Sequence, residues 1–150
     1  MPDDQPLTPA QHAFVAAARS ATLATVATDG SPRLVPICFV LDGDVVLSPL
    51  DEKPKHVDDP RNLARVRDVL ARPGVTLLVH RWDEDWSRLA WLRLRGTALL
   101  IEPGDPQHAA AIAPLRAKYP QYETQAIDAR PMIRIELTLA TSWGELGEEP

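Results

Sequence analysis

The sequence predicts a mainly β, antiparallel fold that curls into a small barrel, with helices at its periphery. Two observations predict this fold class. Short segments rich in apolar and β-branched residues alternate with Gly-containing turns, as in antiparallel hairpins. Six such strands are expected, and a sheet of that kind tends to close because closure removes exposed edges.

The first three strands are expected over residues 21–27, 33–41 and 45–48. Asp29-Gly30 and Asp42-Gly43 fall between them and predict tight turns, so the three strands should form a meander. Pro36 interrupts the second segment. Because proline donates no ladder hydrogen bond, it indicates an edge strand, a bulge or an interruption there.

The other three strands are expected over residues 75–80, 89–101 and 131–142. The first is almost continuously apolar, which predicts that both of its faces are buried. Gly96 indicates a bend in the second. The third alternates strictly, with its inward positions predicted at Ile133, Ile135, Leu137 and Leu139.

Helices are expected before the first strand, after the third and after the fifth. Thr8 can cap the first helix, and Pro9 suits its first turn. Pro60 suits the start of the second, over residues 60–71, and the third is expected over residues 106–119. Residues 1–150 are predicted to form one domain, with loose ends at 1–7 and 144–150.

Composition excludes several classes of protein. The chain has 150 residues, a formal net charge of −5, 45% hydrophobic residues and one cysteine. Its acidic balance argues against a nucleic-acid partner. No apolar run approaches the roughly 18–20 residues of a membrane span, so no membrane partner is expected. The N-terminus does not resemble a signal peptide, and we expect a cytoplasmic location.

Familiar catalytic and metal-binding patterns are absent from the sequence. The four histidines fall in different elements, without cysteine or carboxylate at ligand spacing, so no metal site is expected. No nucleophile elbow, P-loop or dinucleotide-binding glycine pattern occurs. Cys38 is interpreted as a small apolar strand residue. The sequence therefore identifies no catalytic side chain.

Lys53 and Lys55 form the first candidate site. An extended Lys-Pro-Lys segment places both ammonium groups on the same side, just ahead of a helix whose N-terminus prefers anions. The segment can therefore bind a phosphate or a carboxylate. The alternative is a solvated loop neutralised by the neighbouring acidic residues, and composition alone favours that alternative.

Tryptophan and arginine form the second pattern. Trp82, Trp86, Trp91 and Trp143 share segments with several arginines. Ordinary core or interface packing explains such a distribution, because tryptophan is enriched at interfaces. The sharper hypothesis is a subunit interface that also forms the wall of a flat ligand's site.

The order of these elements resembles the split-barrel flavin-binding superfamily, which includes pyridoxamine 5'-phosphate oxidase and the reductases that use the deazaflavin coenzyme F420. The resemblance covers residues 8–143, most of the chain. It is carried by five segments in order: Ala21-Thr22-Leu23-Ala24-Thr25, residues 29–36 (DGSPRLVP), Lys53-Pro54-Lys55, residues 69–79 (VLARPGVTLLV) and Arg95-Gly96-Thr97-Ala98.

The resemblance implies a six-stranded antiparallel split barrel and a homodimer with two cofactor sites at the subunit interface. It also implies which residues contact the cofactor. Arg33, Leu34, Val35 and Pro36 are expected along the ring and its side chain, and Ser48 on the next strand. Lys53 and Lys55 are expected to bind the phosphate, and Trp86 and Trp143 to approach from the partner chain.

Two departures separate the chain from the vitamin B6 oxidases. No arginine follows Trp143-Gly144, where those enzymes hold their substrate, and Ile37-Cys38 replaces an apolar residue and a lysine. The short chain and the cationic loop are more similar to the deazaflavin-using branch. One further departure is the extra length between Lys55 and Leu63.

The resulting hypothesis is a reductase that uses coenzyme F420 to transfer a hydride to a small organic acceptor. The cofactor supplies the hydride, which is consistent with the absence of a catalytic motif. Two alternatives stay open: an FMN-dependent oxidase or reductase of the same fold, and a non-catalytic barrel that binds a flavin or a tetrapyrrole.

Overall fold

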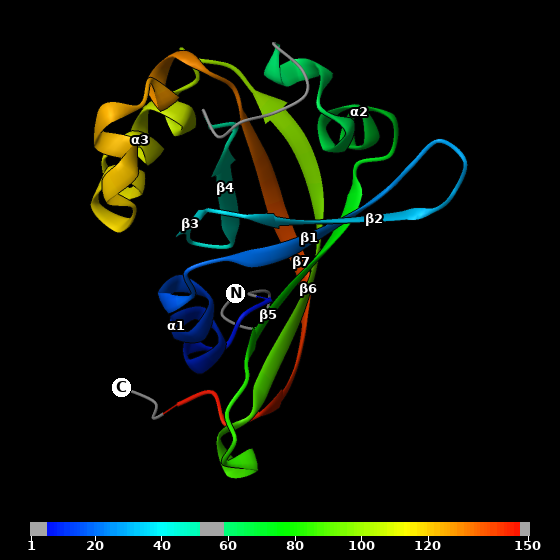
Figure 1. Cartoon of the computed structure of the whole chain (residues 1–150), viewed down its shortest axis with the longest axis vertical. Helices are drawn as coiled ribbons and strands as arrows, with labels where there is room; N and C mark the ends of the chain where they lie inside the picture. Colours follow the sequence, from blue (N-terminus) through cyan, green and yellow to red (C-terminus); the bar gives the residue numbers. More distant parts are fainter. Residues whose placement is uncertain (1–5, 52–58, 148–150) are drawn as a thin grey trace.

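A computed structural model describes residues 6–51 and 59–147. These residues form one seven-stranded sheet in the order β2-β1-β5-β6-β7-β4-β3, in which every neighbouring pair is antiparallel. Figure 1 shows the long strands β6 and β7 running most of the length of the molecule. The strands are β1 Ala21–Val26, β2 Pro32–Ile37, β3 Val40–Asp42, β4 Val45–Pro49, β5 Gly74–Arg81, β6 Ala90–Ile101 and β7 Met132–Gly144.

The two ends of the sheet meet at a split. β2 and β3 are its outermost strands, yet only Cys38 and Phe39 separate them along the chain. Such a connection spans at most about 11 Å, so the sheet must curl until its ends approach. Among the described residues no ladder joins β2 to β3. The architecture is therefore a split barrel, as predicted.

The prediction of six strands was wrong by one, because the segment 33–41 forms two strands. At residues 38 and 39, between the two strands, the backbone forms hydrogen bonds with side chains and not with any strand that the structure describes. The hydroxyl of Ser48 donates to the carbonyl of Cys38 over 2.8 Å, and the amide of Phe39 donates to the Tyr119 hydroxyl over 3.1 Å. Pro36 lies in β2, which is an edge strand, as its missing N–H predicted.

Three α-helices surround the barrel (Figure 1): α1 Pro9–Ala17, α2 Ala64–Ala71 and α3 Pro106–Lys118. Thr8 caps α1 as predicted, accepting a hydrogen bond from the Gln11 amide. The predicted helix over 60–71 is instead a short 3-10 turn followed by α2. The 3-10 segments are η2 Pro60–Asn62, η3 Trp86–Arg88, η4 Pro120–Thr124 and η5 Ile127–Ala129.

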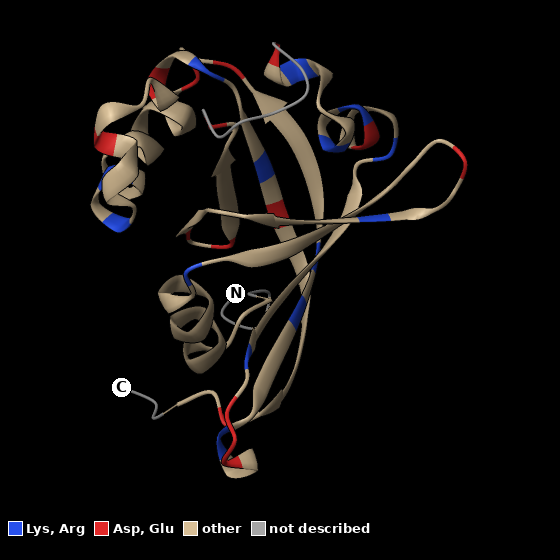
Figure 2. Ribbon diagram, in the orientation of Figure 1, with Lys and Arg blue, Asp and Glu red and all other residues tan. Residues whose placement is uncertain are grey.

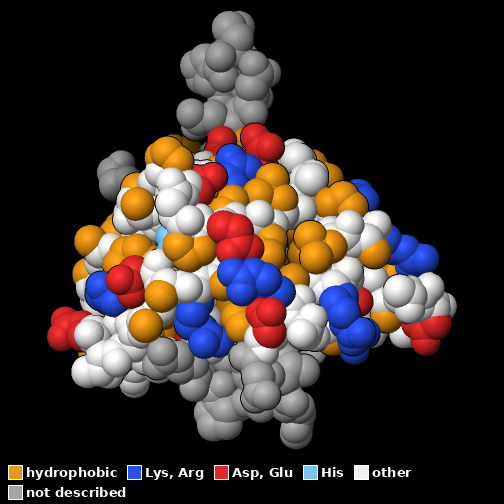
Figure 3. Space-filling view, turned by 90° about the horizontal axis from the view of Figure 1, so that it is seen from above, with side chains coloured by type: hydrophobic (Ala, Val, Ile, Leu, Met, Phe, Trp, Pro, Cys, Tyr) orange, Lys and Arg blue, Asp and Glu red, His pale blue; other side chains and the backbone are white. Residues whose placement is uncertain are grey.

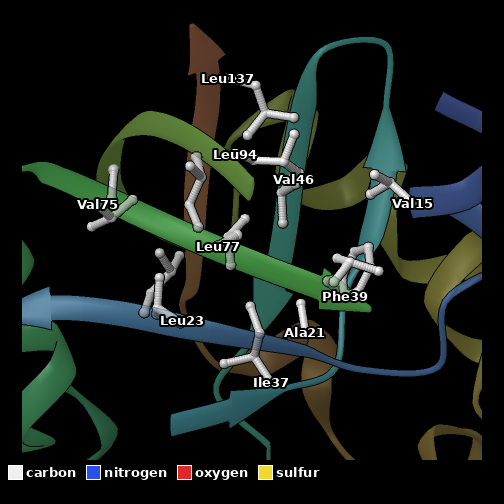
Figure 4. Close-up of a cluster of buried hydrophobic side chains, with 14 of the residues drawn as sticks. Val15, Ala21, Leu23, Ile37, Phe39, Val46, Val75, Leu77, Leu94 and Leu137 are labelled. Atoms are coloured by element: carbon white, nitrogen blue, oxygen red, sulfur yellow. The ribbon is translucent and has the colours of Figure 1, made fainter. Parts of the chain in front are cut away.

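The main core fills the barrel interior. Figure 4 shows side chains from several strands and from α1 converging there, among them Leu23, Leu77 and Leu94. A second apolar cluster contains Leu115 of α3 and Tyr122 of η4. The core residues come from nearly every strand, so the barrel and its helices bury their apolar faces together.

The outer face of the sheet departs from the prediction at two places. β5 buries only one face, since Leu78 and His80 on the other are exposed. Leu139, predicted inward, is exposed as well. A bulge explains this: Arg95 pairs with Leu139 and Gly96 with Leu137, so Thr138 is an extra residue and the alternation reverses beyond it. The bend expected at Gly96 lies at this bulge.

Candidate functional site

The edge strand β2 carries four of the predicted site residues. Leu34 is 67% exposed and Pro36 is exposed, whereas Val35 packs against the core. Pro36 pairs with Thr22 of β1 and has no N–H to donate. This fits a non-hydrogen-bonded pair, in which the backbone N–H and C=O of the β2 residue point away from β1. In a regular ladder Leu34, two residues earlier, then directs its own N–H and C=O to the free edge. A ligand edge can therefore pair with the backbone here.

Arg33, the fourth of these residues, is tied to α2. Its Nε donates a 2.7 Å hydrogen bond to Oδ2 of Asp68, and the Thr25 hydroxyl donates to the same oxygen over 2.7 Å. Burial alone would raise the pKa of Asp68, but the two hydrogen bonds outweigh it and hold that pKa below its usual value. Neither Thr25 nor Asp68 was singled out from the sequence, although a carboxylate between Val66 and Val69 was a visible signal.

Ser48 lies beneath this region rather than on its surface. It is buried, and its hydroxyl donates to the Cys38 carbonyl at the split. In the described structure its side chain therefore joins β4 to the connection between β2 and β3. Its position in β4, next to the split, agrees with the strand predicted for it.

Lys53 and Lys55 lie outside the described residues, so the structure does not place them. The two residues that precede the undescribed segment, Leu50 and Asp51, are well anchored. The Tyr122 hydroxyl donates to Oδ2 of Asp51 over 2.7 Å, and Arg130 donates to the backbone carbonyls of Leu50 and Asp51. The cationic segment therefore begins from a fixed point at the end of β4.

Arg65 of α2 adds a cation that sequence reasoning missed. Its Nε is buried and has no hydrogen-bond partner among the described residues. Burial lowers the pKa of its guanidinium, and the charge of Asp51 only partly opposes this effect. A buried, unpartnered guanidinium N–H is an energetically unfavourable group that an anion would satisfy. In sequence Arg65 resembles an ordinary solvated position of a charged helix.

Several other cations accompany Arg65. Figure 2 shows basic residues gathered on and around α2, and they include Arg61, Arg67 and Arg72. Figure 3 views this end of the molecule from above and shows charged side chains of both signs mixed with hydrophobic ones. The surface seen there is not uniformly basic, which suits a small anion better than a long polyanion.

The two predicted tryptophans lie at the far end of the long strands. Trp86 is in η3 and is 70% exposed, whereas Trp143 is in β7, 53% exposed and paired with Trp91 of β6. Trp143 helps line a groove of about 450 Å³ on the outer face, which Trp86 does not reach. The groove is lined by Leu78, His80, Arg81, Trp82, Leu89, Ala90, Trp91, Arg93 and Trp143.

Neither a metal centre nor a membrane-spanning helix is found among the described residues. In residues 6–51 and 59–147, no three histidine, cysteine or carboxylate side chains are grouped to hold a metal ion. His108 is buried, with its Nε2 lying 2.7 Å from the carbonyl of Arg130. Of the helices that the structure describes, none has both the length and the apolar character to cross a membrane.

A curled antiparallel sheet with a split between β2 and β3 defines a protein of the split-barrel class. The chain belongs to the pyridoxamine 5'-phosphate oxidase family, whose model matches residues 7–144. No curated protein shows significant sequence similarity to it.

Solved structures share the fold at low identity. The conserved hypothetical protein Rv2991 of Mycobacterium tuberculosis has a TM-score of 0.72 and 22% identity, covering 94% of this chain and 87% of that one. A protein described as an F420 reductase has a TM-score of 0.61 and 21% identity, covering 87% and 94%. HutZ, a heme storage protein of Vibrio cholerae, has a TM-score of 0.64 and 15% identity, covering 92% and 94%.

The residues present fit a flavin-type cofactor. Its anionic end would find the Nε of Arg65, which no described residue partners and which lies within reach of the charge of Asp51, the last described residue before Lys53 and Lys55. The polar edge of its ring would find the free backbone edge of β2. These two features suit the two kinds of polar group that such a ligand presents.

Proposed function

We propose that the protein is a homodimeric, coenzyme F420-dependent reductase that transfers a hydride to a small organic acceptor. The observation that carries the proposal is Arg65, a half-buried cation whose buried Nε has no hydrogen-bond partner among the described residues and which interacts with the charge of Asp51, the last described residue before the lysine segment. Membership of the family supports a flavin-like ligand. The departures from the vitamin B6 oxidases after Trp143 and at Cys38 favour the deazaflavin.

When bound, the cofactor supplies the hydride, so the chain's own residues need to bind, orient and exclude water. Arg65, Lys53 and Lys55 hold the anionic end. The backbone of Leu34 orients the ring edge, and Pro36 keeps the neighbouring position of β2 without a donor. A ring held in this way brings an acceptor into alignment by stacking on its open face.

The second subunit is proposed to cover the outer face of β5, β6 and β7. Leu78, Leu139 and Trp143 are exposed on that face, and Trp91 of β6 pairs with Trp143 there. These large exposed apolar side chains share the face with Arg93 and Arg95, and such a grouping marks an interaction surface. Trp143, and Trp86 on its projecting turn, would then approach the partner's cofactor.

The direct test is a fluorescence titration of purified protein with F420 and, separately, with FMN. The proposal expects micromolar or tighter binding of F420. Tight FMN binding without F420 binding would identify the FMN-dependent alternative. Binding of either cofactor without turnover, across a panel of quinones and unsaturated carbonyls, would identify a non-catalytic binding protein.

A further inference from the structure

Asp68 is a buried carboxylate that joins three elements. Its side chain is 5% exposed, and Oδ2 accepts hydrogen bonds from Thr25 of β1 and Arg33 of β2, each over 2.7 Å. A buried carboxylate that accepts two such hydrogen bonds keeps its negative charge. The α2 helix thus holds a fixed anion against the edge of the barrel.

Arg33 uses one edge of its guanidinium for this contact and leaves the other free. Its side chain is 42% exposed, and its only hydrogen bond to a described residue is through Nε. The guanidinium is planar, so fixing Nε also fixes the directions of Nη1 and Nη2. Two parallel N–H donors in this arrangement match the two oxygens of a phosphate or a carboxylate.

The same end of α2 also holds the β1–β2 hairpin. Arg72, which follows the helix, donates from Nη1 to the carbonyl of Ala27 over 3.0 Å, just before the turn. The hairpin is therefore tied to α2 at Thr25, Ala27 and Arg33. Arg33 is set in place by two elements and does not depend on a bound ligand for its orientation.

We propose that Asp68 is a positioning residue: it orients Arg33, which the resemblance already assigns to the cofactor, so that the free guanidinium edge faces an oxyanion on the tail of the bound cofactor. The inference rests on the proposed function, because it concerns the same ligand. Asp68 cancels part of the charge of Arg33, so what it contributes to anion binding is direction. An ion pair that only attaches α2 to the barrel would leave ligand affinity unchanged.

The test measures how much an anionic tail improves binding. Dissociation constants are determined for FMN against riboflavin, and for F420 against the 5-deazariboflavin core that lacks its tail. Arg33→Lys keeps the charge, but a single ammonium group cannot bind Asp68 and a tail oxyanion as a fork. The tail-dependent gain is the factor by which the dissociation constant falls when the ligand carries its anionic tail. We expect Arg33→Lys to reduce this gain by about fivefold or more.

Two more variants separate positioning from charge. In Asp68→Asn the removal of a negative charge alone would strengthen anion binding, so a reduced gain reports lost orientation. Arg134→Lys in β7, whose Nε likewise binds one side chain, that of Gln107, is the matched control outside the anion site and should change the gain by less than about twofold. Melting temperatures of all variants are recorded, and Arg33→Lys, being at an exposed residue, remains informative if Asp68→Asn does not fold.

The outcomes distinguish the inference from the proposed function. If the wild-type protein binds neither cofactor, the proposed function fails and the inference fails with it. If the wild type binds with a tail-dependent gain that Arg33→Lys and Asp68→Asn leave unchanged or increase, only the inference fails. A loss with both FMN and F420 identifies the phosphate as the partner of Arg33, and a loss with F420 alone identifies a carboxylate.

Discussion

The hydroxyl of Tyr122 donates a 2.7 Å hydrogen bond to the carboxylate of Asp51, and both side chains are buried. Burial raises the pKa of Tyr122, and the hydrogen bond to Asp51 raises it further, so the phenol stays protonated and remains a donor. This contact joins η4 to the end of β4. It fixes the last described residue before the segment that contains Lys53 and Lys55.

Replacing Tyr122 with Phe should therefore destabilise the protein by about 1–3 kcal/mol, since Asp51 loses a hydrogen bond in a buried site. Urea denaturation at pH 7 measures the change. Thr124→Ala, which removes an exposed hydroxyl of the same 3-10 segment, is the control and should have a much smaller effect. Equal stabilities for the wild type and Tyr122→Phe would contradict this account.

A second prediction concerns the bulge in the β6–β7 ladder. A β carbon at Gly96 would lie 2.6 Å from the Glu136 carbonyl oxygen and 2.7 Å from Cγ2 of Ile135. Gly96→Ala should lower stability by about 1–3 kcal/mol, because backbone must move to admit the methyl group. Gly74→Ala is the matched control in the neighbouring strand, where nothing lies within 4 Å of the added atom. Similar melting temperatures for the two variants would show that the ladder tolerates the methyl group.

Lys118 predicts a pH dependence of stability. Its buried ammonium lies 4.0 Å from the centre of the Phe39 ring, and burial, with the nearby charge of Arg19, lowers its pKa to about 8. An unfolded lysine titrates near 10.4, so between about pH 8 and pH 10 the unfolded chain binds more protons than the folded one. The contribution of Lys118 to stability therefore rises with pH across this window.

The measurement compares the wild type with Lys118→Met by urea denaturation at pH 7, 8, 9 and 10. The wild type should gain stability relative to the variant as the pH rises through this range. A constant difference would mean that Lys118 titrates normally in the folded protein.

The outer face of the sheet predicts the oligomeric state. The wild type should run as a dimer in sizing chromatography with light scattering, and Leu139→Glu should produce monomers, because a charge in an apolar interface is unfavourable. Leu70→Glu changes a leucine on α2 that is even more exposed than Leu139, and it should leave the dimer intact. A wild-type monomer at micromolar concentration would contradict the proposal that two subunits together form each cofactor site.

The anion site gives a further prediction. Arg65→Gln, and Lys53→Ala together with Lys55→Ala, should each weaken cofactor binding by about 1–3 kcal/mol for every charge-assisted hydrogen bond to the anion that the substitution removes. The melting temperature of the lysine variant without cofactor should change little. If affinity is unchanged in both variants, the phosphate binds elsewhere.

Local sequence signals predicted much of the fold. Pro36 indicated an edge strand, Thr8 and Pro9 the start of α1, and Gly96 the irregularity in β6. Proline restricts its own backbone and donates no N–H, threonine accepts a capping hydrogen bond, and glycine allows another backbone to approach closely. The same reasoning failed for Leu139 and for the segment 33–41. Both depend on partners distant in the sequence: the β6–β7 register in one case, and Ser48 and Tyr119 in the other.

The sequence by itself determined the antiparallel barrel and its turns, since hydrophobic period and turn chemistry are local properties, whereas the candidate residues of β2 came from the resemblance to the family. Only the tertiary structure decided that Asp68 reaches Arg33, that Arg65 is left with a buried Nε unpaired by any described residue, and that Leu78, Leu139 and Trp143 are exposed on one outer face. Hydrogen-bond partners and burial depend on which segments the fold brings together, and no local pattern encodes those distances.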